Sequence, residues 1–200
     1  MSGAGDAERA VHDRVLDATK RCCERWGIAK VTIDDIAAEA GTSRATIYRL
    51  FPGGRDVLYE ALRVRETEEF MATLTEHVTG AATFEEVVVR GVVGATRMLQ
   101  TDEHMKLMLA SEPGEVVTDL TVDGLPRIFR VATVFLTPFF APYIGREQSA
   151  RLAEWLARVV ISYFLAPSRY VDLADEASAT EFVRSFVLPA FEPSSVPIGR

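Results

Sequence analysis

Residues 32–51, TIDDIAAEAGTSRATIYRLF, decide the fold of this chain. In the first half, apolar residues recur at the three- and four-residue spacing of an amphipathic helix. They are Ile33, Ile36, Ala37 and Ala40. Thr32 is placed to cap the start of this helix, with Asp35 three residues later as in a capping box. Gly41 follows the last apolar position and predicts the left-handed residue on which a helix ends.

A second short helix follows almost at once. Ser43 offers its N-cap, and the helix is expected to run to about Phe51. Two short helices joined by a tight turn that contains glycine form a helix-turn-helix. At 100° per residue, Ile47, Leu50 and Phe51 point toward a small core.

The opposite face of the second helix and its flanks are polar or small. They carry Arg44, Ala45, Thr46, Tyr48 and Arg49. Arginine recognises guanine edges, alanine and threonine methyls contact thymine, and tyrosine and serine hydroxyls bind phosphate, so this set suits a DNA major groove. The same spacing also occurs in a surface helix of an ordinary bundle, and spacing alone leaves that alternative open.

The residues themselves resemble a known family. The motifs are Thr32-Ile33-Asp34-Asp35-Ile36-Ala37, Ala40-Gly41-Thr42-Ser43, and Ala45-Thr46-Ile47-Tyr48 with Phe51. In these the chain resembles the TetR family of bacterial transcriptional regulators, specifically from about Val15 to Leu62. Beyond Leu62 the resemblance rests on helix pattern and length. It implies an all-helical homodimer with an N-terminal DNA-binding domain and a C-terminal domain for ligand binding and dimerisation. Most members are repressors that a small molecule releases from DNA.

The helix-turn-helix interpretation assigns the contacts with operator DNA. Phosphate contacts are expected from Thr32, Thr42, Ser43, Tyr48 and Arg55, and base-edge contacts from Arg44, Ala45, Thr46 and Arg49. The resembling proteins often carry lysine at the position of Gly54, where it helps to hold a phosphate. Here Arg55 is the nearest cation.

Bulk composition is consistent with a cytoplasmic globular protein. The chain has 200 residues, is 48% hydrophobic and 26% charged, and has neither a long apolar run nor an apolar core near its N-terminus. The net charge of −7 lies mainly outside the first 60 residues, which hold 9 Lys/Arg against 10 Asp/Glu. Charge placement matters more than the total for DNA binding. We therefore expect a DNA-binding head on an acidic body, without membrane association.

Helical periodicity predicts an all-α fold of about nine helices in two domains, residues 9–68 and 69–192. Residues 1–8 are expected to form a disordered tip. The expected helices are 10–26, 33–40, 44–51, 56–78 (which crosses the domain boundary), 84–100, two short pieces within 103–122, 125 to the breakers Pro138 and Pro142, 147–166 and 176–191.

The C-terminal domain supplies the candidate ligand and dimer residues. The ligand set is Gly91, Gly94, Met98, Arg130, Phe135, Phe139 and Tyr163. Close packing of a neighbouring helix is the alternative explanation for the two glycines, and ordinary core packing for the aromatic residues. The last two helices are apolar over wide arcs, so a symmetry-related copy is the expected second partner. The dimer set is Leu152, Trp155, Leu156, Val159, Val160, Phe182 and Phe186.

Other classes of function fit the sequence less well. No hydrolase, phosphate-loop, dinucleotide or metal-ligand motif occurs, so neither a catalytic site nor a cofactor is expected. Cys22 and Cys23 are interpreted as small apolar helix residues, with a redox switch as the alternative. The sequence predicts a repressor that binds a pseudo-palindromic operator as a homodimer and is released by a small hydrophobic ligand. A same-fold activator, a regulator controlled by a protein partner, a helical enzyme and a partner-binding module without DNA affinity remain alternatives.

Overall fold

The computed structural model describes residues 3–102, 105–106 and 125–191. These residues form eight α-helices and contain no β-strand. The chain separates into two compact units, and the division falls between Glu66 and Thr67. This division lies within one continuous helix, α4 (Arg55–Val78). The predicted all-α fold is confirmed, whereas the domain limits of 9–68 and 69–192 stay a prediction.

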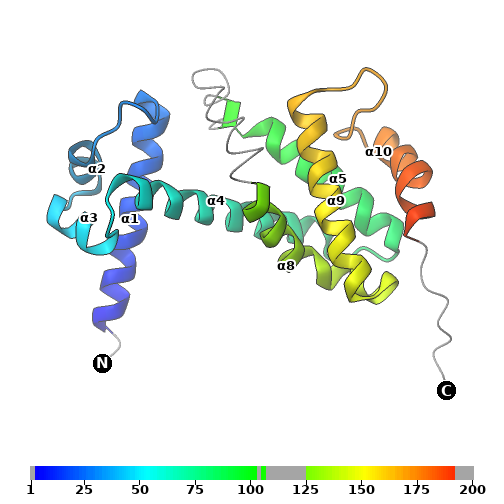
Figure 1. Ribbon diagram of the computed structural model, residues 1–200, viewed down its shortest axis with the longest axis horizontal. Coiled ribbons are helices and arrows are strands. Elements are labelled where there is room, and N and C mark those ends of the chain that lie inside the picture. The colour runs from blue at the N-terminus through cyan, green and yellow to red at the C-terminus, as the bar shows by residue number, and fades with distance from the viewer. Residues whose placement is uncertain (1–2, 103–104, 107–124, 192–200) are drawn as a thin grey trace. The chain divides into compact units, whose positions relative to one another are not determined.

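The first unit contains three helices and the start of a fourth (Figure 1). Their bounds are α1 Gly3–Trp26, α2 Ile33–Ala40, α3 Arg44–Leu50 and α4 Arg55–Val78. Their buried side chains form one core, centred on fully buried residues of each helix: Val15, Ile36, Ile47 and Leu58. Buried side chains of α1 and α4 therefore pack against the inner side of the helix-turn-helix.

The turn between α2 and α3 forms as its residues predict. The N–H of Asp35 donates to Oγ1 of Thr32 at 3.2 Å, and the N–H of Thr32 donates to Oδ2 of Asp35 at 2.9 Å, which completes a capping box. Gly41 adopts the left-handed conformation, with φ 61°, and the N–H of Thr42 donates to the carbonyl of Ala37 at 3.0 Å. These local bonds fix where α2 begins and where it ends.

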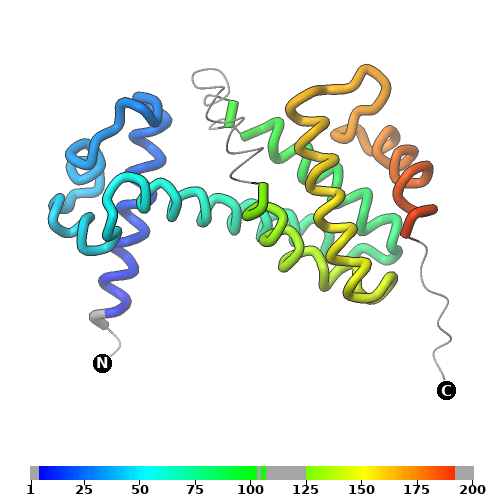
Figure 2. Tube along the Cα trace, viewed as in Figure 1, coloured from blue at the N-terminus to red at the C-terminus, as the bar shows by residue number. Residues whose placement is uncertain are grey.

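The second unit is a bundle around a large apolar core that extends from Met71 to Val187. Besides the end of α4, its elements are α5 Phe84–Thr101, α8 Leu125–Ile144, α9 Arg146–Leu165 and α10 Glu176–Phe182, followed by a π-helical turn, Val183–Val187, and a 3₁₀ turn, Leu188–Ala190. Helices α8 and α9 pack as an antiparallel pair (Figure 1). Figure 2 shows the path of the chain from α9 into α10 and the final turns.

The glycines of α5 lie against α4. A Cβ atom at Gly94 would meet Cδ1 of Leu74 at 3.3 Å, and one at Gly91 would meet Cγ1 of Val78 at 3.6 Å. Both glycines thus allow a close approach of two helices. Close packing, the alternative considered from the sequence, accounts for their presence within a helix.

The predicted disordered tip is wrong for residues 3–8, since α1 begins at Gly3. Ala4, Ala7 and Glu8 are good helix formers, and Asp6 in the first turn interacts favourably with the helix dipole. The added turns bring Glu8 into contact with Arg49 of α3. The N-terminal residues therefore belong to the first unit.

The predicted stop at Pro138 and Pro142 is also wrong, because α8 continues to Ile144. Each proline lacks an N–H and leaves the carbonyl four residues earlier without its helical partner. Val134, Pro138 and Pro142 all lie on one exposed side of α8, and Val134 is 70% exposed. Water can hydrogen-bond to these carbonyls there, which makes the prolines tolerable.

The last predicted helix, 176–191, is not one regular α-helix. Its α-helical part ends at Phe182, and the N–H of Leu188 then donates to the carbonyl of Val183 in a π-type bond. Pro189 follows directly and cannot continue an α-helical hydrogen-bond pattern. The short helices predicted within 103–122 fall outside the described residues, apart from residues 105–106, which are helical.

Among the described helices, none has the length and apolar character needed to span a bilayer.

Candidate nucleic-acid interface

The outer face of α3 is open to solvent. Ile47 is fully buried, whereas Tyr48 is 46% exposed. The Arg44 and Arg49 side chains are 59% and 60% exposed. Ala45 is exposed and Thr46 is half-buried at the edge of this face. The structure thus brings all the residues predicted to contact bases onto one outward surface.

Ser43 fixes the start of this helix. The N–H of Thr46 donates to Oγ of Ser43 at 3.1 Å, and the two side-chain oxygens lie 2.9 Å apart. Thr32 is exposed, and its hydroxyl donates to Oδ2 of Asp35 at 2.6 Å. Thr42 is half-buried in the turn. Phosphate contacts by these three hydroxyls stay a prediction, and those of Thr32 and Ser43 already serve as helix caps.

Gly54 has a packing role that the sequence did not indicate. It is buried with φ +73°, and a Cβ atom there would come within 3.0 Å of Cε1 of Tyr48. A lysine at this position, as the resembling proteins often have, would be strained in backbone and would press on the tyrosine ring. Gly54 therefore makes room for Tyr48 at the edge of the α3 surface.

Arg55 is engaged within the first unit. Its guanidinium donates to the carbonyl of Ile28 and lies 5.1 Å from the ring centroid of Tyr59. Tyr59 is buried and its hydroxyl donates to the same carbonyl at 3.3 Å. Arg55 thus ties the loop after α1 to the start of α4, while its predicted phosphate contact stays a prediction.

Both cysteines are buried in the core of the first unit. Burial raises the pKa of Cys23 to about 11 and the pKa of Tyr59 to about 12. The pKa of Cys22 is also raised, again mainly by burial. A thiol kept neutral is a poor nucleophile, so this environment favours the interpretation of the cysteines as packing residues.

Each arginine of the outer face is paired with a carboxylate from another helix. Nη1 of Arg44 donates to Oδ2 of Asp34 on α2 at 3.1 Å. Nη1 of Arg49 donates to Oε1 of Glu8 on α1. Neither acid was predictable as a partner from the sequence, because pairs 10 and 41 residues apart leave no local spacing signal.

Comparison with known proteins places this surface in a family. The sequence profile described as "Bacterial regulatory proteins, tetR family" matches residues 15–62, which include all of α2 and α3. The chain belongs to the TetR family. It is a DNA-binding transcriptional regulator and not an enzyme. Figure 1 shows the matched helices at the start of the chain, from blue to cyan.

Similarity to TetR-family proteins extends over most of the chain. An uncharacterized HTH-type transcriptional regulator of Mycobacterium tuberculosis is 25% identical over 186 residues, 92% of this chain and 86% of that protein. The crystal structure of the TetR family repressor AlkX from Dietzia, implicated in biodegradation of n-alkanes, has a TM-score of 0.67 and 26% identity, covering 88% and 94% of the two chains. The SmeT–triclosan complex has the same fold, with a TM-score of 0.51, 22% identity and coverage of 96% and 99%.

The residues proposed to bind ligand in this TetR-family chain do not form one uniform environment. Arg130 is exposed, and Gly91 and Gly94 pack against α4. Met98, Phe135, Phe139 and Tyr163 are half-buried against the core of the second unit. These four apolar side chains are the part of the predicted set best placed to meet a hydrophobic molecule, and their role stays a prediction.

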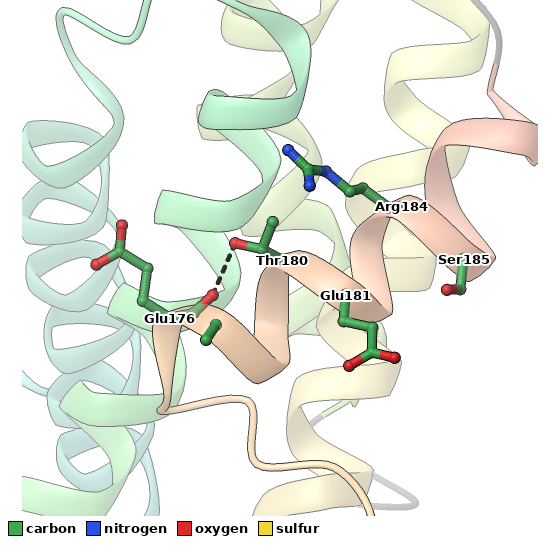
Figure 3. A pocket seen from close by; sticks show the side chains of 6 residues that line it. Glu176, Thr180, Glu181, Arg184 and Ser185 are labelled. Carbon is green, nitrogen blue, oxygen red and sulfur yellow. Dashed lines mark hydrogen bonds between the residues drawn. The ribbon is translucent and has the colours of Figure 1, made fainter.

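An open groove also runs along α10 and the π turn (Figure 3). It lacks the enclosure of a ligand cavity. Glu176, Thr180 and Arg184 line it together with Ala177, Glu181 and Ser185. All six residues come from one continuous stretch of helix. Among the described residues, no group of three His, Cys, Asp or Glu side chains is arranged to hold a metal ion.

The predicted dimer residues divide into two groups. Leu152, Leu156, Val160 and Phe182 are buried within the protomer, where they contribute to the core. Phe186 is 62% exposed, and Trp155 and Val159 are half-buried. The first group stabilises the helices, and only the second presents substantial surface to a partner.

Proposed function

We propose that this TetR-family regulator is a repressor that binds a pseudo-palindromic operator as a homodimer and is released by a small hydrophobic ligand. The observation that carries the proposal is the outward face of α3, on which Arg44 and Arg49 are exposed while Ile47 anchors the helix in the core. A helix held in this way enters the major groove with its polar face toward the bases.

The exposed aromatic surface of the second unit supports a dimer. The ring centroids of Phe186 and Phe182 lie 5.3 Å apart, and those of Trp155 on α9 and Phe191 lie 6.4 Å apart. The Trp155–Phe191 contact joins α9 to the C-terminal end of the described chain, and Phe186 remains largely in water. A two-fold axis through this region would bury the same surface of both copies, as in other helical dimers.

A hydrophobic ligand is supported by the half-buried apolar residues of α5, α8 and α9. AlkX, a repressor implicated in n-alkane biodegradation, and SmeT, which forms a complex with triclosan, indicate the kind of molecule to test. Ligand binding would favour a distance between the two DNA-binding units of the dimer that does not fit successive major grooves. The unbroken α4 would transmit the displacement. A tenfold loss of operator affinity requires about 1.4 kcal/mol of coupling.

The operator is tested by selecting duplexes from a random library with the purified full-length protein. We expect enrichment of a sequence with two inverted half-sites, because a two-fold dimer presents two copies of α3. Enrichment of a single asymmetric site would contradict the dimeric arrangement. Absence of any enrichment, with no binding to random duplex at low salt, would contradict DNA binding through α3.

Ligand release is tested by calorimetric titration of n-decane and of triclosan into the protein, with and without the selected duplex. Linkage requires that a releasing ligand bind more weakly to the DNA complex, by the same factor by which it weakens DNA binding. Equal affinity for the free protein and the complex would remove the proposed release mechanism.

A further inference from the structure

In each of the two exposed arginines of α3, only one guanidinium nitrogen, Nη1, is hydrogen-bonded to another described residue. Nη1 of Arg44 binds Asp34, and Nη1 of Arg49 binds Glu8. Nε and Nη2 of both arginines make no hydrogen bond with any part of the chain that the structure describes. The Nε–Nη2 edge presents two parallel donors, the geometry that recognises O6 and N7 of guanine.

The carboxylates come from helices that are themselves fixed. Asp34 lies in the first turn of α2, which has a capping box at its start and a left-handed glycine at its end. Glu8 lies in α1, which contributes Val15, Leu16 and Ala18 to the core. Each acid is therefore a positioned partner that limits the rotamers of an otherwise flexible arginine. Orientation before binding reduces the entropy lost when the base contact forms.

If only the negative charge of Asp34 and Glu8 mattered, these acids would oppose DNA binding and would not orient the arginines. The Asp34 and Glu8 side chains are 63% and 51% exposed, and surface ion pairs at such sites contribute little to stability. Carboxylates beside the DNA-facing surface also repel phosphates, which weakens binding to every sequence. Acids that only opposed DNA would therefore act on all duplexes alike, whereas acids that orient arginines improve the discrimination between bases.

We propose that Asp34 and Glu8 are positioning residues that determine specificity, each orienting one arginine of α3 for base recognition. This inference rests on the proposed DNA-binding mode of α3. The acids lower affinity for DNA in general and raise the ratio of operator to random binding. In the operator complex each carboxylate keeps its bond to Nη1 while the Nε–Nη2 edge contacts a base.

The test compares wild-type protein with Asp34→Ala and Glu8→Ala by fluorescence anisotropy. The probes are a duplex that the wild-type protein has selected from a random library and a random-sequence duplex of equal length. We expect random-duplex affinity to rise about threefold for each variant, because one negative charge is removed from each protomer. We expect the operator-to-random ratio to fall about tenfold, within the range that one bidentate base contact contributes.

Two variants complete the design. Asp34→Asn keeps an acceptor oxygen without the charge, so it should raise random binding as Asp34→Ala does but retain most of the ratio. Glu60→Ala removes an exposed acid of the first unit that pairs with Arg63 on the same helix, α4, and should leave the ratio unchanged. Thermal unfolding of each variant checks that the first unit remains folded.

The outcomes separate the explanations. An equal rise in affinity for both duplexes, matching Glu60→Ala, would show a charge effect only and would overturn the inference. An equal fall for both duplexes would show a structural role and would also overturn it. If wild-type protein binds neither duplex, the proposed function fails, and this result differs from one in which wild-type protein discriminates and the variants keep its ratio.

Discussion

At the scale of single residues, two kinds of contact build the surface of α3: helix caps between neighbours in the sequence, and ion pairs that join α3 to α1 and α2. Thr32, Ser43 and Gly41 were assigned as caps, and each occupies its expected place, because caps depend on residues within one helical turn. The partners of Arg44, Arg49 and Arg55 were not predictable, because they come from other elements.

The buried Cys23–Tyr59 region predicts a loss of stability in alkali. Burial raises the pKa of Cys23 to about 11 and the pKa of Tyr59 to about 12. Both groups therefore stay neutral in the folded protein at pH values at which they ionise in the unfolded chain. Their contribution is complete below about pH 9 and is lost as the pH rises through the folded pKa values. From pH 8 to 10.5 the Cys23 contribution to unfolding free energy should fall by up to roughly 2 kcal/mol.

Urea unfolding of wild-type protein and Cys23→Ala at both pH values measures this contribution. The alanine variant lacks the thiol and should lose less stability between the two pH values, although it is less stable at pH 8 because of the cavity. Identical losses in the two proteins would show that Cys23 does not titrate differently in the folded and unfolded states.

At the scale of elements, the positions of the α-helices were largely predictable, whereas their ends and the π and 3₁₀ turns after Phe182 were not. Proline was interpreted as a breaker at Pro138 and Pro142, yet α8 passes through both. The cost of a proline depends on whether the carbonyl it leaves unpaired can reach water, and the exposed side of α8 provides that access. The sequence alone does not specify which side of a mostly apolar helix faces solvent.

The contact between α4 and α5 predicts different effects of adding a methyl group at its two glycines. Gly91→Ala should stabilise the protein by roughly 0.5–1 kcal/mol, because the new Cβ would lie 3.6 Å from Val78 and alanine favours a helix. Gly94→Ala should gain less or destabilise, because its Cβ would lie only 3.3 Å from Leu74. Chemical unfolding of both variants measures the difference. An equal gain from both would indicate free space beside Gly94, as the ligand-binding interpretation requires.

At the scale of the whole molecule, the sequence predicted an apolar C-terminal surface but not which of its residues are free to meet a partner. Four of the seven proposed dimer residues are buried within the protomer. Leu152, for example, is fully buried, so its hydrophobicity is satisfied without a second copy. A helix apolar over a wide arc does not itself distinguish a core contact from an interface.

The proposed dimer predicts that Phe186→Glu yields monomers. Phe186 is 62% exposed in the protomer, and a charge there would be buried without a partner in the interface. Val134→Glu on α8 is the matched control, because Val134 is 70% exposed and outside the proposed interface. Sedimentation velocity measures both variants at the same concentration. A dimeric Phe186→Glu protein, or a monomeric Val134→Glu protein, would move the interface away from α9 and the C-terminal turns.

The most direct measurement of the central claim, that α3 presents its arginines to the bases of the operator, is an operator-variant series with Arg44→Ala. Wild-type and variant proteins are titrated with the selected duplex and with duplexes substituted at one symmetric pair of positions at a time. We predict that Arg44→Ala weakens the binding free energy for the operator by about 1–3 kcal/mol per recognised base. The variant should lose discrimination between bases at one position in each half-site and keep it at all other positions. A uniform loss of affinity across the series, with discrimination intact at every position, would contradict the claim.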